Sequence, residues 1–235
     1  MTGAVVSFMC NSRKQSLRGA LYLSAAVLVG CAAPNSQYYS LQSPASVPPA
    51  AITQIVDAIS VQSVSVPVQV DRPQLVVSRA GGAQVNLLND SLWAAPLGDE
   101  IRQAVAGHLS RQLGVPDLDR LSAPGDLPVW TIRLTVHQFD SVYDAQARLD
   151  ISWRLAAVNA GSKAKGLPLV CRAIAIAPAG NSVDALVQAH QQALAAVSGL
   201  IAAQVQQLRE GKPAQQAKAP DWASPTLTLQ GCTAA

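Results

Sequence analysis

Three histidines and one pair of aspartates are the side chains here with the chemistry for catalysis or metal binding. His108, His137 and His190 have no partner ligands at the spacing of metal sites, so we predict no metal. Asp140 and Asp144 could form the pair of carboxylates that glycoside hydrolases use. Their position at a predicted turn favours a structural role instead. The sequence also lacks the motifs of serine hydrolases, phosphate-binding loops and zinc proteases. We therefore expect no enzyme and no cofactor.

Cys31 is the residue whose chemistry the sequence predicts most directly. It closes Leu28-Val29-Gly30-Cys31, which matches the lipobox at which exported bacterial proteins are cleaved and acylated. Basic residues precede an apolar stretch over 20–29, which is too short to span a bilayer and is typical of a secretory signal. We predict a signal peptide over 1–30 and lipidation, with chains such as palmitate, at Cys31. The alternative is an ordinary signal peptide that happens to place a cysteine there.

Charge and sorting signals restrict the compartment and the partners. The chain has 17 Lys and Arg against 14 Asp and Glu, and three of the basic residues lie in the predicted signal, so the mature chain is neutral. This excludes the basic footprint of a nucleic-acid binder. Ala32 stands where an Asp would favour retention in the inner membrane. We therefore expect a protein that is lipid-anchored in the outer membrane and faces the periplasm.

Two cysteines remain in the mature chain besides Cys31. Cys171 and Cys232 in an oxidising periplasm predict one disulfide, and two free thiols are the alternative. Such a bond would pin a C-terminal tail, which we place at 211–235. Before it, we expect a lipidated flexible tether over 31–51 and a periplasmic domain over 52–210. Within the tether, 38–41 (Tyr-Tyr-Ser-Leu) has the composition of a short strand.

The first half of the domain predicts one strand, one hairpin and one helix. A strand is expected over 55–66, at an edge or kink because Pro67 and Pro73 follow. Strands over 74–79 and 84–88 flank Gly81-Gly82 and indicate a hairpin. A helix is expected over 96–113, with Pro96 at its first position and Gly114 ending it.

The second half has the clearest alternation of apolar and polar residues. Two long strands, 130–136 and 145–155, are joined by a turn at 140–144. Their polar faces predict cross-strand charge pairs among Arg133, Arg148, Arg154 and Asp150, and a partner-binding sheet face is the alternative. A third strand over 167–176 and a helix over 182–208, capped by Ser182, follow. The fold class is α/β, an α+β sandwich: a mixed, largely antiparallel sheet with two main helices on one face.

Several of these segments together resemble a known family. They are Cys31, Tyr-Tyr-Ser-Leu at 38–41, Asp-Arg-Pro-Gln-Leu-Val at 71–76, Trp93 before the helix, and the long C-terminal helix. The chain resembles the ABC-type transport auxiliary lipoprotein family. The resemblance implies a domain similar to the N-terminal domain of TolB. It also implies partners: an MCE-domain protein, a permease and an ATPase that move lipids between membranes. The sequence leaves open whether the protein forms a homo-oligomer.

Candidate partner-interface residues are Asp71, Arg72, Pro73 and Trp93. The three consecutive residues also fit a turn before a strand, and Trp93 also fits a core position. Three functions therefore remain: a transport auxiliary lipoprotein, a TolB-like lipoprotein that activates a cell-wall synthase, and an envelope hydrolase. The hydrolase depends on Asp140 and Asp144 alone.

Overall fold

The computed structural model describes residues 35–42, 55–119, 121, 125–159, 168–218 and 224–234. The predicted signal segment, Cys31 and most of the predicted tether lie outside these residues. The described strands are β1 (Gln37–Tyr39), β2 (Ala58–Val61), β3 (Gln74–Arg79), β4 (Val85–Trp93), β5 (Val129–Tyr143), β6 (Gln146–Val158), β7 (Leu169–Pro178) and β8 (Thr226–Ala234). The helices are α2 (Leu97–Leu113), α3 (Val183–Arg209) and the short 3-10 helix η2 (Ala214–Gln216).

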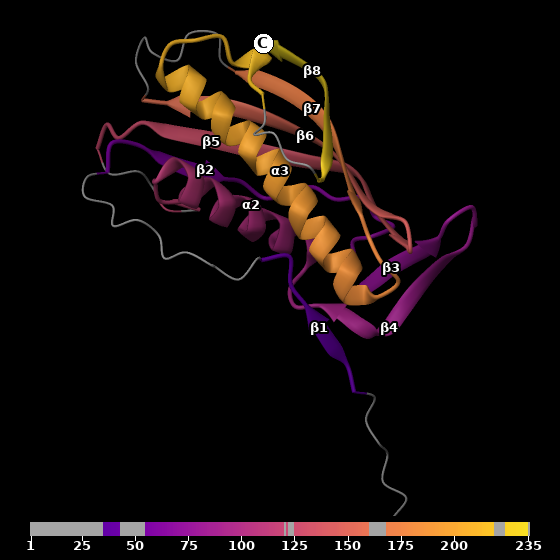
Figure 1. Cartoon of the computed structure of the whole chain (residues 1–235). Coiled ribbons are helices and arrows are strands. Elements are labelled where there is room, and N and C mark those ends of the chain that lie inside the picture. Colours follow the sequence, from indigo (N-terminus) through magenta and orange to yellow (C-terminus); the bar gives the residue numbers. More distant parts are fainter. Residues whose placement is uncertain are drawn as a thin grey trace, which may run out of the picture. The chain divides into compact units, whose positions relative to one another are not determined.

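All described strands form one sheet, with both long helices on one face (Figure 1). The order is β1-β4-β3-β5-β6-β7-β8, and β2 lies beside β5 off this path. The pairs β1–β4, β2–β5 and β3–β5 are parallel, and the other neighbouring pairs are antiparallel. The predicted class, a largely antiparallel sheet with two helices on one face, is confirmed.

The central meander β5-β6-β7 follows the alternation of its sequence. Ile132, Leu134, Leu149 and Ile151 point to the helices and are fully buried, whereas the residues between them face away. β5 is longer than predicted and runs to Tyr143. Asp140 therefore lies within the strand, paired with Arg148, and the prediction that 140–144 is a turn is wrong for its first residues.

The predicted hairpin is confirmed as β3 and β4. Gly81 adopts a φ of 73°, which L side chains avoid, and Gly82 N donates to Arg79 O to close the turn. β4 continues beyond the predicted end to Trp93, where it pairs with β1. β2 is shorter than the strand predicted over 55–66 and occupies an edge beside the first part of β5, as the following prolines indicated.

The two long helices lie close to their predicted positions. α2 ends at Gly114, which has a φ of 67°. Pro96 is the residue before the first turn, so its prediction as the first helical residue is off by one position. Ser182 caps α3 as predicted, because its Oγ accepts from Ala185 N at 3.1 Å. No described helix is both long and apolar enough to cross a bilayer.

The C-terminal segment contains a strand that the sequence analysis did not predict. β8 pairs antiparallel with β7, and Leu227 and Leu229 turn towards the core. Cys171 and Cys232 are direct register partners and form a disulfide, as predicted. The described part of 211–234 thus extends the sheet instead of forming only a pinned tail.

Candidate functional site

The histidines are held in structural contacts. His190 is 1% exposed, stacks on Phe139 with ring centroids 3.8 Å apart, and shares a hydrogen bond of 2.9 Å with Ser141 Oγ. Burial lowers the pKa of His190 to about 3, so the ring is neutral at physiological pH. A neutral histidine sealed from solvent lacks the access to substrate that acid–base catalysis requires.

The other two histidines also contact neighbouring side chains. His108 lies beside Arg111 at 3.3 Å, and burial together with the Arg111 charge lowers the pKa of His108 to about 4. His137 is exposed on the face of the sheet away from the helices and shares a hydrogen bond of 2.9 Å with Ser152 Oγ. Among the described residues, no three His, Cys, Asp or Glu side chains gather as a metal site would require.

Asp140 and Asp144 occupy different surroundings. Asp140 helps line a groove of about 380 Å³ between β3, β5 and the turn at 67–70. Burial raises the pKa of Asp140, and the positive charge of Arg148 opposes that rise. Asp144 is exposed in the β5–β6 turn at a φ of 52° and is not among the groove residues. This arrangement matches turn chemistry for Asp144 rather than a shared catalytic site.

The predicted charge pairs on the polar sheet face are largely wrong. Asp150 is bound by Arg172 of β7, whose Nε and a terminal nitrogen donate at 2.8 and 2.9 Å. This hydrogen bonding lowers the pKa of Asp150. Arg133 lies directly opposite Arg154, so these two bring like charges together. Alternation predicted which residues share this face, but the pairing depends on the register between strands.

The candidate interface residues divide between surface and core. Asp71 and Pro73 are exposed at the end of the turn that begins at Pro67. Pro73 O accepts from Trp93 N at 2.8 Å, which ties this segment to the end of β4. Trp93 is 6% exposed and packs edge-to-face on Phe139, with centroids 6.0 Å apart. Asp71, Arg72 and Pro73 follow Val70, which lines the groove, whereas Trp93 is a core residue.

The structure also reveals a junction where the predicted tether enters the body. Glu100, in the first turn of α2, is 2% exposed, and its Oε2 accepts from Ser40 Oγ and Leu41 N, both at 2.8 Å. Leu41 is fully buried in the core. Gln191 of α3 donates to Ser40 O at 3.0 Å. We call the residues Ser40, Leu41, Glu100 and Gln191 the anchoring junction.

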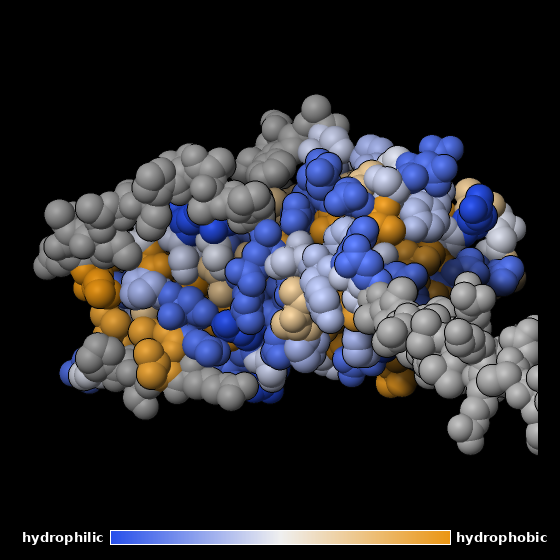
Figure 2. Space-filling model, turned by 90° about the horizontal axis from the view of Figure 1, so that it is seen from below, coloured by the Kyte–Doolittle hydropathy of each residue, from blue (hydrophilic) through white to orange (hydrophobic). Residues whose placement is uncertain are grey.

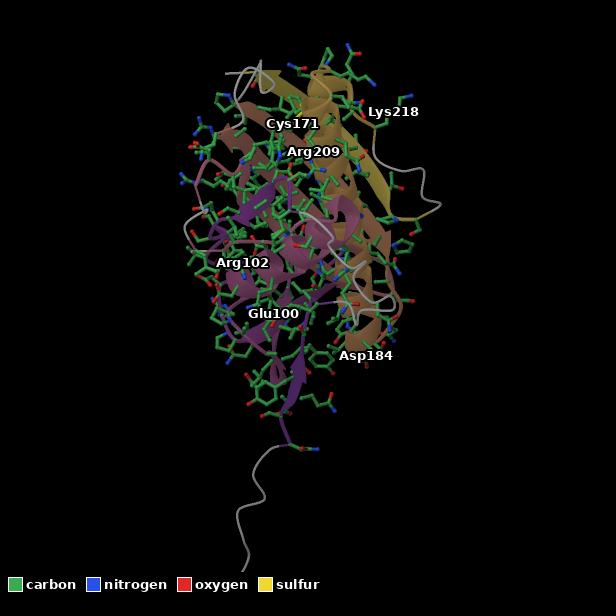
Figure 3. The ribbon with its side chains drawn as sticks, turned by 90° about the vertical axis from the view of Figure 1, so that its left-hand side faces the viewer. Glu100, Arg102, Cys171, Asp184, Arg209 and Lys218 are labelled. Carbon is green, nitrogen blue, oxygen red and sulfur yellow. A yellow bond between two sulfur atoms is a disulfide. The ribbon has the colours of Figure 1, made fainter. Side chains whose placement is uncertain are left out.

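A different set of contacts holds the opposite end of the body. Asp57 is 6% exposed and accepts from Trp130 Nε1 at 2.8 Å and from Arg209 Nε at 2.7 Å. Gln204 accepts from Trp153 Nε1 at 2.8 Å and donates to the disulfide sulfurs. Figure 3 shows Glu100 towards the end where β1 leaves the body, with Arg209 and Cys171 towards the other end.

The anchoring junction was missed by the sequence analysis, although a weak signal was present. Leu41 is an isolated apolar residue just before a Pro-rich stretch, and Glu100 lies where a carboxylate suits a helix N-terminus. The hydrogen bonds from Ser40 and Leu41 to Glu100 join residues that are 60 and 59 positions apart. Such separations leave no local pattern.

Comparison with known proteins identifies the chain. The sequence profile of the ABC-type transport auxiliary lipoprotein component matches residues 39–202. The chain belongs to the ABC-type transport auxiliary lipoprotein family. The profile begins at Tyr39 and ends at residue 202, so the matched region includes the anchoring junction, β2 to β7, all of α2 and most of α3.

Two solved structures share the fold of this family member. One, a crystal structure of an uncharacterized protein, is 22% identical with a TM-score of 0.56, and the match covers 73% of this chain and 99% of that one. The other, a Xanthomonas campestris protein of the DUF330 family, is 17% identical with a TM-score of 0.50 and coverages of 74% and 96%. No curated protein matches the chain. Family membership makes the chain an envelope-associated transport component.

Proposed function

We propose that this protein is an outer-membrane lipoprotein that binds the protein components of an MCE and ABC-type intermembrane lipid transport system and has no catalytic turnover. Membership in the transport auxiliary family supports the transport role. The neutral, buried His190 and the separate surroundings of Asp140 and Asp144 favour binding over catalysis. The partners we propose are the MCE-domain protein and its permease and ATPase.

The anchoring junction is the observation that carries this proposal. The folded unit begins at Ser36, only five residues after the predicted lipidated Cys31. Five residues span at most about 18 Å when fully extended. The stretch of chain between Cys31 and β1 is therefore short, so in this proposal the body stays closer to the membrane surface than the 21-residue tether predicted over 31–51 would hold it. A protein held in this way suits the positioning of partners near one membrane.

Lipid attachment would make this position long-lived. Several acyl chains, each contributing about 0.8 kcal/mol per buried methylene, anchor a protein effectively permanently. A fixed anchor and a rigid junction together restrict where the body can meet a transport complex. We therefore propose that the protein acts by holding its folded body at a fixed distance from the membrane, and that it does not catalyse a reaction.

The test is recovery of partners from crosslinked envelope membranes, with the full-length precursor expressed at its native level. We compare the unaltered chain with Cys31→Ala and with Cys10→Ala, a matched cysteine substitution inside the predicted signal. We expect the unaltered chain and Cys10→Ala to fractionate with the outer membrane and to recover the MCE-domain protein. Cys31→Ala should lose both properties.

Three outcomes would contradict the proposal. Fractionation of the unaltered chain with the inner membrane would overturn the outer-membrane assignment. Recovery of peptidoglycan synthases without any MCE-domain protein would favour the cell-wall role instead. Full lipid transport by a strain without the protein would remove the transport role.

A further inference from the structure

Two arginines face each other on the helix-free side of the sheet. Arg133 of β5 and Arg154 of β6 are direct register partners, and both are exposed. Like charges directly opposite on neighbouring strands destabilise a sheet. Among the described residues, neither arginine forms an ion pair. The pair therefore lacks an internal counter-charge that would explain it as a stabilising feature.

The two carboxylates that β5 and β6 place on the same face lie beside other arginines. Asp150 is held by two hydrogen bonds from Arg172. Asp140 lies opposite Arg148, which acts on its pKa. Each of these two carboxylates has another arginine beside it on the neighbouring strand, and β5, β6 and β7 contain no further Asp or Glu that could neutralise Arg133 and Arg154.

Exposed aliphatic residues adjoin the two arginines. Val170 of β7 is the register partner of Arg154 and is 37% exposed. Val158 lies four residues beyond Arg154, on the same face of β6, and is 52% exposed. We call Arg133, Arg154, Val158 and Val170 the arginine patch. The described strands β5, β6 and β7 contain no lysine.

This composition favours a protein partner over a lipid surface. Protein interfaces are enriched in arginine and depleted in lysine, whereas polybasic lipid-binding segments use clusters of four to eight basic residues. Figure 2 shows one face of the molecule, on which hydrophobic residues lie among hydrophilic ones.

The patch also lies away from the end that is tethered. On the helix side of the sheet, Trp153, which precedes Arg154 in β6, donates a hydrogen bond to Gln204 of α3. The α3 residue of the anchoring junction is Gln191. These two positions are 13 residues apart on α3, which corresponds to about 20 Å along the helix. The patch is thus offset from the point at which the chain leaves towards Cys31.

We propose that the arginine patch is the docking surface for an acidic segment of a protein partner. A carboxylate placed between Arg133 and Arg154 relieves their repulsion and accepts paired hydrogen bonds from a guanidinium. Val158 and Val170 exclude water beside it. The inference rests on the proposed function, which supplies the partner: the MCE-domain protein of the transport system.

The experiment measures binding of the periplasmic part of the MCE-domain protein to the full-length acylated lipoprotein in detergent, over a series of salt concentrations. The test variant is Arg133→Gln/Arg154→Gln. The matched control is Arg79→Gln/Arg111→Gln, which makes the same change in net charge elsewhere on the body. We expect at least tenfold weaker binding and a shallower salt dependence for the test variant only. Its thermal midpoint should be unchanged or slightly higher, because the repulsion is removed.

The outcomes separate this inference from the proposed function. If the unaltered protein and the test variant bind the MCE-domain protein equally, the arginine patch is not the docking surface, although the proposed function stands. If the unaltered protein does not bind at all, both are overturned. If the test variant binds the protein normally but loses binding to phosphatidylethanolamine–phosphatidylglycerol vesicles, the patch contacts lipid and the inference is wrong.

Discussion

The two ends of the folded chain are attached to the same sheet by different means. The N-terminal segment is held by a three-residue strand, the buried Leu41 and hydrogen bonds to Glu100 and Gln191. The C-terminal segment is held by a nine-residue strand and a disulfide. The first attachment depends on one buried side chain and on polar contacts that substitution can break, whereas the second is covalent. The end nearest the predicted lipid anchor is therefore the one whose attachment can change.

Removing the covalent attachment should have the largest effect on stability. The disulfide joins residues 61 positions apart. In the chain-entropy model, Cys171→Ala/Cys232→Ala lowers the free energy of unfolding by about 4 kcal/mol. Urea denaturation of the double variant and of the unaltered protein gives this difference. A loss well below 1 kcal/mol would show that the β7–β8 ladder holds the C-terminal strand without the bond.

Leu41→Ala should have the next largest effect, at the opposite end. Leu41 is fully buried, and truncation of a buried leucine costs about 3 kcal/mol through lost contacts and a cavity. We expect faster amide exchange across 37–42 than across β8. Tyr38→Ala, which alters an exposed side chain on the same segment, is the control. Equal protection in Leu41→Ala and the unaltered protein would mean that the junction does not depend on this side chain.

Acid should weaken the body through His190. The pKa of His190 is about 3 in the folded protein against the ordinary value of 6.5 in the unfolded chain, so the unfolded chain binds the proton more readily. The stability this provides is complete above about pH 6.5 and is lost as the pH falls towards 3. At pH 5 the loss from His190 is about 2 kcal/mol. The partly buried His108, whose pKa is also lowered, changes the stability in the same direction.

Denaturation at pH 7 and pH 5 tests this expectation, with His190→Gln as the variant that cannot titrate. Gln191, the next residue, belongs to the anchoring junction, so we expect the N-terminal attachment to loosen before β8 does. An unchanged pH dependence in His190→Gln would contradict the role of this ring.

Gln191→Ala should have the smallest effect. Its amide nitrogen donates to Ser40 O at 3.0 Å, and loss of one such hydrogen bond costs about 1 kcal/mol. Gln192→Ala, at an exposed neighbouring position, is the control. A loss as large as that of Leu41→Ala would indicate that polar contacts dominate the junction.

Elements whose residues alternate or repeat locally were predictable from the sequence. The hairpin, β6, β7 and both long helices lie close to their predicted positions, because each buries one face with a regular period. β8 was missed since only Leu227 and Leu229 mark its inner side. Glu100 lies where a carboxylate suits a helix N-terminus, but its hydrogen bond to Leu41 N depends on tertiary packing. The pairing of Asp150 with Arg172 likewise depends on strand register.

The Asp57–Arg209 ion pair has a consequence for how the family's body can be rearranged. It brings the first described residues of the main body next to the last turn of α3, across 152 positions of sequence. Domains whose ends meet in this way tolerate circular permutation and insertion into other chains. Residues 57–209 thus form a stretch of chain whose two ends lie side by side, and the outer segments that carry Leu41 and β8 are added to this stretch from either end.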